Sequence, residues 1–464
     1  MNIKQAKQEI TNTLKAYLAK DQLGNYLIPT VRQRPVLLMG PPGVGKTQIM
    51  EQIAAETGVG LVAYTITHHT RQSAIGLPFI EKRTYGGEEV SVTEYTMSEI
   101  LSSVYRLMER TGLQEGILFL DEINCVSETL APMMLQFLQC KTFGNQALPE
   151  GWLIVAAGNP PEYNKSVRDF DVVTLDRVKR IDVEEDYGVW KEYARRKNLH
   201  GAILSYLDIK KDNFYRIENT ADGLQFATAR GWEDLSELLY AYETLGIRAD
   251  REVVGQYIQM PRIAKDFANY LEMFYKYQKT YHVEGILSGT WENITVLELR
   301  EAPFDEKLSV MGLVLSRLSE EARNTRRQDA LTDALHTSLT EFREKIADAP
   351  PLTVLDQLLW KRRTAMKDKE SRDLKQREIN VLEDYRQRLD REAVAPEGAM
   401  DAVRGWFGEE VERRKAMAME TKDMFDNAFR FLETTFGDSQ ELVIFVTEIT
   451  AGYDLSLIHI SEPT

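Results

Sequence analysis

The residues from Gly40 to Thr47, which read GPPGVGKT, combine the residue types that a bound phosphate chain requires. Glycines let successive backbone N–H groups turn toward one anion. An apolar run precedes this loop and helical spacing follows it, so a helix N-terminus would face the same ligand. Lys46 would reach the β- and γ-phosphates, and the Thr47 hydroxyl would bind Mg²⁺. The pattern predicts a triphosphate site lined by Gly40, Pro41, Pro42, Gly43, Val44, Gly45, Lys46, Thr47 and Gln48.

Two carboxylates, Asp121 and Glu122, end a second apolar run. Because the carboxyl ends of parallel strands meet at one edge of a sheet, both are expected beside the phosphates. Asp121 would hold Mg²⁺ together with Thr47, and Glu122 would orient and deprotonate the attacking water. Asn159 follows a third apolar run, and its amide would position that water. An acidic turn and an ordinary Asn-Pro turn are the alternative interpretations.

These side chains need a parallel sheet to bring them together. The apolar runs at 36–39, 61–66, 117–120 and 152–157 are typical of buried strands, and segments with helical spacing separate them. An apolar stripe over 3–18 predicts a further helix that packs on the same domain. The order of the elements predicts an α/β fold with a parallel-sheet core.

Composition limits the classes of partner. The chain has 464 residues, 43% of them hydrophobic and 28% charged, as in soluble proteins with two or more domains. Its formal net charge of -15 argues against a broad surface for nucleic acid or anionic membranes. Cys125 and Cys140 lack metal-ligand spacing and suggest a reducing compartment. His68-His69 would need further ligands that no useful spacing supplies.

The two ends of the sequence bear on location and boundaries. The N-terminal residues lack an apolar signal core, and no apolar run is long enough to span a membrane, so we expect a cytoplasmic protein. Residues 455–464 look like the translation of a sequencing-library adapter. We therefore expect the natural sequence to break off near Asp454.

Taken together, the motifs resemble the AAA+ ATPases, and within them the MoxR family, over residues 30 to 245. The resemblance makes the loop from Gly40 to Thr47 the Walker A motif of a P-loop NTPase that hydrolyses ATP. It makes Asp121 and Glu122 the Walker B pair and Asn159 the residue called sensor 1.

Two arginines complete the resemblance. Arg177 falls where the family has its arginine finger, although Arg180 competes for that role. Arg230 falls where the family has the residue called sensor 2. The alternative interpretation is an ordinary residue in the first turn of a helix. The family often has arginine where this chain has Cys125, so the chain departs from the family pattern at this position.

Two segments are expected to form β-hairpins. Residues 79–95 contain Gly86-Gly87 between alternating segments, and residues 141–151 contain Gly144-Asn145. They resemble the family's helix-2 insertion and pre-sensor-1 hairpin. The first hairpin would either line a pore or decorate the surface.

The remainder is expected to be helical. Helical spacing over 187–279 fits a lid that carries Arg230 on its inner face. Residues 360–391 alternate basic and acidic side chains and are interpreted as an exposed long helix or coiled coil. We prefer a helix face that is simply solvated over an arm that binds a partner. The expected divisions are an N-terminal helix (1–30), an AAA+ nucleotide-binding α/β domain (31–186), a helical lid (187–290), a mostly helical, charged extension (291–454) and a non-native tail (455–464).

The resemblance also implies a function. Such ATPases form rings of identical subunits, with a hexamer as the expected size, and couple Mg-ATP hydrolysis to remodelling or maturation of a protein client, often one with a von Willebrand factor A domain. A nucleic-acid motor or loader is one alternative, and the net negative charge of the chain argues against it. A nucleotide-gated scaffold with little turnover is another, which Glu122 opposes because a scaffold has no need of a catalytic base.

Overall fold

The computed structural model of the chain contains two compact units, which we call unit 1 and unit 2. The residues that the structure describes are 1–68, 76–143, 146–161, 163, 167, 170–220, 223–364 and 372–451. Unit 1 comprises Met1–Lys191, Asp212–Asp234 and Tyr257–Met260, and unit 2 comprises Glu192–Lys211, Leu235–Gln256 and Pro261–Thr464.

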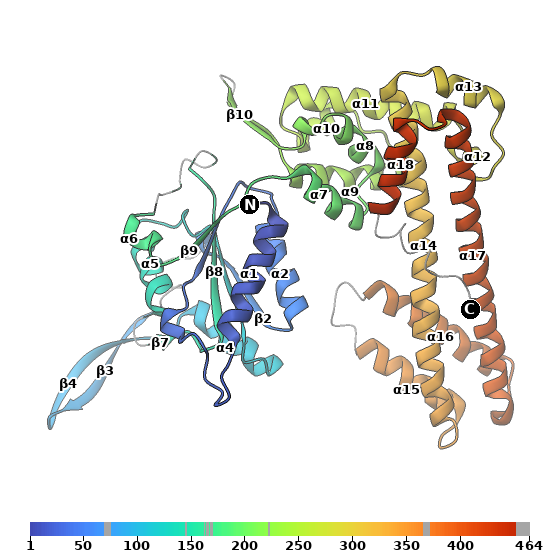
Figure 1. Cartoon of the computed structure of the whole chain (residues 1–464). Coiled ribbons are helices and arrows are strands. Elements are labelled where there is room, and N and C mark those ends of the chain that lie inside the picture. The colour runs from blue at the N-terminus through green and yellow to red at the C-terminus, as the bar shows by residue number, and fades with distance from the viewer. Residues whose placement is uncertain are drawn as a thin grey trace. The chain divides into compact units, whose positions relative to one another are not determined.

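A five-stranded parallel sheet forms the centre of unit 1 (Figure 1), which confirms the predicted fold class. The strand order is β2-β5-β8-β1-β9. The first strand in sequence, β1, therefore lies inside the sheet, and the loop that follows it emerges beside the carboxyl end of β8. The strands are β1 (Val36–Met39), β2 (Gly60–Thr65), β5 (Gly116–Asp121), β8 (Trp152–Gly158) and β9 (Lys179–Asp182).

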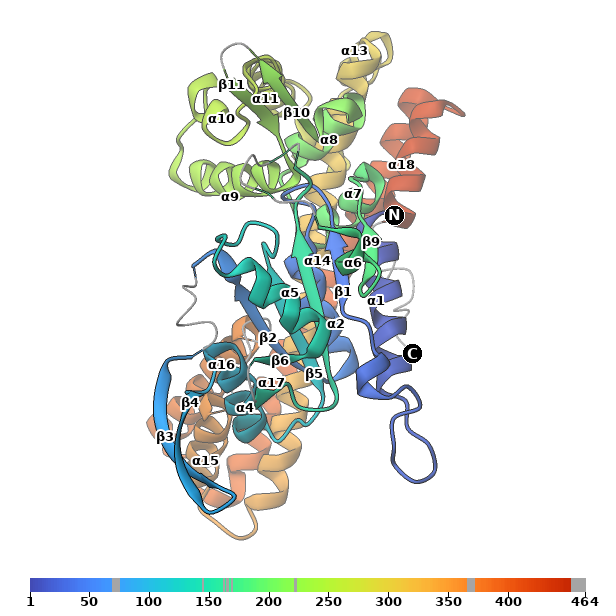
Figure 2. The ribbon, with the colours of Figure 1, turned by 90° about the vertical axis from the view of Figure 1, so that its left-hand side faces the viewer.

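Helices cover both faces of this sheet (Figure 2). Successive side chains of a strand point to opposite faces, so continuous apolar runs supply both layers. On one face Leu38 and Phe119 join the core of α1 (Ile3–Leu18) and α2 (Lys46–Thr57), which confirms the predicted N-terminal helix. On the other, Leu37 and Leu118 join the core of α4 (Glu99–Thr111) and α5 (Ala131–Cys140).

Both predicted hairpins are confirmed. Strands β3 (Pro78–Tyr85) and β4 (Glu88–Tyr95) pair antiparallel and extend away from the sheet (Figures 1 and 2). The positive φ angles of Gly86 and Gly87, 61° and 94°, suit the tight turn between them. The second hairpin pairs β6 (Thr142–Phe143) with β7 (Gln146–Ala147), and its predicted turn, Gly144-Asn145, lies outside the described residues.

The expectation of helical structure throughout 187–279 is wrong in one place. A two-stranded hairpin of β10 (Arg216–Thr220) and β11 (Gly223–Ala227) interrupts the helices. The sequence Asp222-Gly223 is a turn signal that the helical interpretation overlooked. The helices of this region are α7 (Tyr187–Arg196), α8 (Gly201–Ile209), α9 (Ala229–Leu245), α10 (Arg251–Tyr257) and α11 (Pro261–Thr280).

Residues 360–391 are expected to form an exposed long helix or coiled coil, and the single exposed helix is wrong. The described residues form two helices, α15 and α16, whose apolar side chains are buried with those of α14 and α17. Leu382 and Leu355 are completely buried in this core. The elements after α11 are α12 (Val283–Leu287), α13 (Asn293–Glu301), α14 (Phe304–Lys345), α15 (Pro351–Thr364), α16 (Arg372–Arg391), α17 (Ala399–Phe436) and α18 (Gln440–Ala451).

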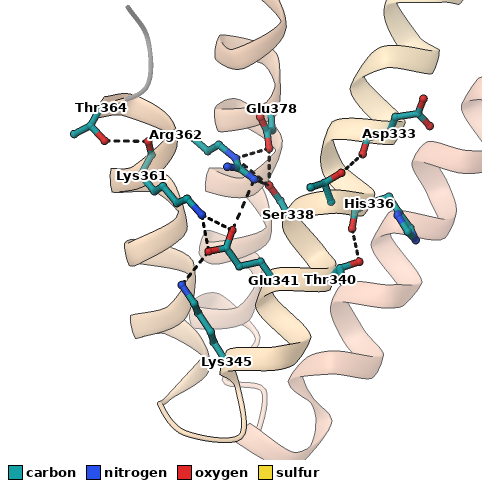
Figure 3. A network of polar contacts seen from close by, with 11 residues as sticks. Asp333, His336, Ser338, Thr340, Glu341, Lys345, Lys361, Arg362, Thr364 and Glu378 are labelled. Atoms are coloured by element: carbon teal, nitrogen blue, oxygen red, sulfur yellow. Dashed lines mark hydrogen bonds and ion pairs between the residues drawn. The ribbon is translucent and has the colours of Figure 1, made fainter. Parts of the chain in front are cut away.

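A polar network connects α14, α15 and α16 in unit 2 (Figure 3). The Glu378 carboxylate, only 5% exposed, accepts hydrogen bonds from the Ser338 hydroxyl at 2.5 Å and from Arg362 Nε at 2.9 Å. Lys361 and Lys345 donate to Glu341 and hold the pKa of its carboxyl below the usual value. A buried carboxylate that is paired and hydrogen-bonded in this way depends on all its partners. The charged residues of this region therefore help to hold the helices together.

Candidate functional site

The loop after β1 has the backbone geometry of an anion cradle. Gly43 and Gly45 have φ angles of 79° and 92°, a region that side-chain-bearing residues rarely adopt. Lys46 and Thr47 then begin α2, so the N-terminus of this helix adjoins the loop. Val44 packs against the core shared with α1. The structure therefore gives the loop the turn and the helix dipole that the sequence predicts.

Lys46 lies inside this loop and is only 8% exposed. Its Nζ donates to the Gly40 carbonyl at 2.7 Å, to the Pro41 carbonyl at 2.9 Å and to Asn159 Oδ1 at 2.8 Å. These three acceptors are neutral oxygens. Burial lowers the Lys46 pKa to about 8, against the opposing effect of the Asp121 charge. A buried ammonium of this kind fits an anionic ligand such as a phosphate chain, because an anion would stabilise its charged form.

Asp121 and Glu122 lie beside the start of α2. The Thr47 hydroxyl donates to Asp121 Oδ2 at 3.0 Å, and Asp121 Oδ1 accepts from the Glu122 N–H at 2.9 Å. Glu122 has a φ of 57°, and its carboxylate accepts from the Thr67 hydroxyl at 2.8 Å. A hydroxyl and a carboxylate side by side are the hard oxygen donors that fit Mg²⁺.

Other metal arrangements find no support in the described part of the chain. Within it, no group of three or more His, Cys, Asp or Glu side chains could hold a metal ion. Mg²⁺ typically needs only one or two protein oxygens, because phosphates and waters complete its coordination. His69 of the His pair lies outside the described residues.

Asn159 lies at the carboxyl end of β8, and a neighbour that the sequence did not identify holds it there. Asn124 is 3% exposed, and its Nδ2 donates to the Asn159 carbonyl at 2.7 Å while its Oδ1 accepts from the Asn159 N–H at 3.3 Å. A Cβ on Gly158 would lie 2.7 Å from Asn124 Oδ1, so this close packing requires glycine. Asn124 thus holds the backbone of Asn159, whose side-chain oxygen bonds to Lys46.

Arg230 comes to the same loop from a distant part of the sequence. It lies in the first turn of α9, in the part of that helix that belongs to unit 1. A Cβ on Gly43 would be 3.6 Å from Arg230 Cβ, so the two backbones are close. The Arg230 charge also lowers the pKa of Lys46, which places it near the phosphate site.

Arg177 and Arg180 lie apart from this cluster, before and within β9. Arg177 is exposed and donates to the Gln139 side-chain oxygen. Arg180 is held by Asp182, with Nε to Oδ1 at 2.9 Å. Among the described residues, no hydrogen bond or ion pair joins either arginine to the phosphate loop of the same chain.

Two further loop contacts complete the site. Gln48 Oε1 lies 3.4 Å from where a Cβ on Gly45 would be. The hydroxyl of Tyr215, between α8 and β10, donates to the Pro42 carbonyl at 2.8 Å. Sequence reasoning missed Tyr215, and a lone tyrosine 173 positions from the loop carries no signal that would have identified it.

Most residues of this site lie in a segment that matches a family model. Residues 35–178 match the family model described as AAA domain (dynein-related subfamily). No curated protein matches the chain. Among solved structures the chain is similar to a "putative ATPase" from Cytophaga hutchinsonii, with 17% identity and a TM-score of 0.26 over 42% of this chain and 56% of that one. The chain thus spans somewhat over half the length of that structure.

No helix among the described residues is both long and apolar enough to cross a membrane.

The family match covers β1, the phosphate loop, Asp121, Glu122 and Asn159. It stops before Arg230. The part of the chain that is similar to an AAA domain therefore contains four of the five strands of the parallel sheet of unit 1.

Proposed function

We propose that this protein is a MoxR-like ATPase that couples Mg-ATP hydrolysis in a ring of identical subunits to the remodelling or maturation of a protein client. The observation that carries the proposal is that Lys46, Thr47, Asp121, Glu122 and Asn159 converge on one loop. These side chains come from two strand ends and one helix start, so their convergence depends on the parallel sheet. A triphosphate with Mg²⁺ uses all five residue types.

Each residue has a distinct role in this proposal. Lys46 binds the β- and γ-phosphates, and Thr47 and Asp121 hold Mg²⁺, which neutralises charge on the phosphate oxygens when it is bound. Glu122 orients the attacking water and accepts its proton. Asn159, whose Oδ1 accepts a hydrogen bond from Lys46 at 2.8 Å, orients the same water.

In the proposed ring, each subunit supplies an arginine finger to the nucleotide of its neighbour. Arg177 is exposed and bonds to a neutral amide oxygen, whereas Arg180 is paired with a carboxylate. A guanidinium whose hydrogen bond goes to a neutral amide is a better donor to the γ-phosphate of a neighbouring subunit than one that a carboxylate holds. We therefore assign the arginine finger to Arg177 and sensor 2 to Arg230, which adjoins the loop of its own chain.

The client class rests on the MoxR resemblance and on charge. A net charge of -15 suits a protein client better than nucleic acid. A protein with a von Willebrand factor A domain is the client that the resemblance suggests, and a hexamer is the ring size it suggests.

The test uses the variant Glu122→Gln, which should bind Mg-ATP without hydrolysing it. The tagged full chain is incubated with source lysate and ATP, and Lys46→Ala serves as the matched control that cannot hold the phosphates. We expect one folded protein to be retained by Glu122→Gln with ATP and lost with Lys46→Ala.

Two results would contradict the proposal. Retention of nucleic acid in place of protein would favour a motor or loader. Retention of the same proteins by both variants would favour a scaffold that acts independently of nucleotide state.

A further inference from the structure

Two prolines at the start of the phosphate loop limit which backbone groups can bind phosphate. Proline has no N–H, so the peptide bonds entering Pro41 and Pro42 supply only carbonyls. The Gly40 N–H is already used, because it donates to the Gly158 carbonyl at 3.3 Å. The next N–H along the chain is that of Gly43. The orientation of the peptide between Pro42 and Gly43 therefore decides where the first backbone donor of the cradle points.

Tyr215 holds this peptide. Its hydroxyl donates to the Pro42 carbonyl at 2.8 Å. In a trans peptide the C=O and N–H groups point in opposite directions, so a bond that fixes the Pro42 carbonyl also fixes the Gly43 N–H. Lys46 holds the two preceding carbonyls, of Gly40 and Pro41, but neither of those peptides carries an N–H. Tyr215 thus acts on the first peptide of the loop whose N–H is able to face a phosphate.

The packing and hydrogen bonding of the neighbouring Phe214 hold Tyr215 in place. Its neighbour Phe214 is 4% exposed and packs against Trp190, with ring centroids 4.7 Å apart. The Phe214 carbonyl accepts a hydrogen bond from Trp232 Nε1 at 3.0 Å, and Trp232 is completely buried. Burial raises the pKa of the Tyr215 phenol, so its hydroxyl stays protonated and remains a donor at physiological pH.

The segment that carries Tyr215 also lies close to Gly43. A Cβ on Gly43 would be 3.6 Å from Cβ of both Thr228 and Arg230. Pro42 and Gly43 are therefore flanked by residues of one segment, Asp212–Asp234, which belongs to the same compact unit as the loop.

We propose that Tyr215 is a positioning residue for nucleotide binding, which holds the Pro42 carbonyl away from the ligand and so directs the Gly43 N–H at the phosphate chain. The inference rests on the proposed ATPase function. It adds a residue from outside the matched domain to the phosphate site.

The experiment compares Tyr215→Phe with the unsubstituted full chain. The variant keeps the ring and its packing and loses only the hydroxyl. Tyr281→Phe is the matched control, because its hydroxyl donates to Glu306 at 2.8 Å in unit 2. Dissociation constants for ATP and ADP are measured by displacement of a fluorescent ADP, and KM and kcat by phosphate release. Thermal melting of each unliganded protein verifies folding.

We expect Tyr215→Phe to bind ATP and ADP about 2- to 10-fold more weakly, the loss of one net hydrogen bond. KM should rise by a similar factor while kcat changes less than about twofold, since the catalytic side chains keep their contacts. Tyr281→Phe should match the unsubstituted chain.

Unchanged nucleotide affinity in Tyr215→Phe would overturn the inference, and so would an equal loss in Tyr281→Phe. A fall in kcat with unchanged affinity would also overturn it. If the unsubstituted chain neither binds nor hydrolyses ATP, the proposed function itself fails, which is a different result from any of these.

Discussion

Asn124 provides the sharpest test of how the proposed active site is supported. Its side chain makes two hydrogen bonds to the backbone of Asn159, at 2.7 and 3.3 Å, and is 3% exposed. Asn124→Ala removes both bonds and leaves the Asn159 N–H and carbonyl without these partners. Asn124→Asp keeps the shape but replaces the donor with an oxygen, so two oxygens would face each other at the position of the 2.7 Å bond. We therefore expect Asp to be at least as harmful as Ala.

The size of the effect follows from these contacts. Two buried hydrogen bonds, with the cost of leaving their partners unsatisfied, should lower the free energy of unfolding by about 2 to 4 kcal/mol. The effect on catalysis should be larger than on binding, because Asn159 would shift while the phosphate loop keeps its backbone. A shift of about 1 Å in a group that positions a reactant can cost on the order of 10²-fold in rate.

Steady-state ATPase assays and urea unfolding measure the two effects. Asn380→Ala is the control, since Asn380 makes a similar amide hydrogen bond, with Gln376 at 2.9 Å, on an exposed helix surface. Gly158→Ala approaches the same contact from the other side, because its new Cβ would collide with Asn124 Oδ1, and should lower kcat as well. If Asn124→Asp retained the kcat of the unsubstituted chain, the argument that Asn124 positions Asn159 would be refuted.

Four further predictions concern Lys46, the two candidate finger arginines and the polar network of unit 2. Because the Lys46 pKa is about 8 and bound phosphates should raise it, ATP binding should take up about 0.1 proton at pH 7 and about 0.8 at pH 8.5. Calorimetry in buffers of different ionisation enthalpy measures this uptake, and equal uptake at both pH values would contradict it. In the absence of ligand, a lysine pKa lowered by folding makes the fold more stable as pH rises from about 8 to 10.5, because the unfolded chain then binds more protons. Arg177→Ala should lower kcat in the assembled ring by on the order of 10³ or more, whereas Arg180→Ala should change it little, and the reverse order in an ATPase assay would move the finger to Arg180. Arg362→Ala leaves Glu378 buried without its cation and should destabilise unit 2 by about 3 to 5 kcal/mol in chemical denaturation. Arg386→Ala, at an exposed pair with Asp356, should have little effect, and similar losses from both variants would show that burial of Glu378 is unimportant.

The sequence alone was sufficient for the parts of the site that are local. The phosphate loop needs particular residue types at fixed spacing, so Gly43, Gly45 and Lys46 could be identified before any fold was known. The buried strands were recognisable because a parallel sheet covered on both faces requires continuous apolar runs. Asp121 and Glu122 followed from the end of such a run.

The structure decided what depends on contacts between distant segments. Asn124 follows Glu122 closely in the sequence but was not singled out, because its two bonds to Asn159 arise only when β5 and β8 pair. The hairpin β10–β11 was missed because the short strands lie within a region of strong helical spacing. The charged pattern at 360–391 predicted exposure, although Glu378 and Leu382 are buried, because charge alternation does not reveal which face a neighbouring helix covers.

Tyr215 and Arg230 illustrate the same limit at the site itself. The family resemblance suggested Arg230, whereas Tyr215 had no motif to mark it. Both reach the phosphate loop because the segment that carries them belongs to the same compact unit as the sheet. A sequence determines by itself the chemistry that needs fixed local spacing. Chemistry that depends on one hydrogen bond across 173 positions is decided only by the packing that brings the two groups within 2.8 Å.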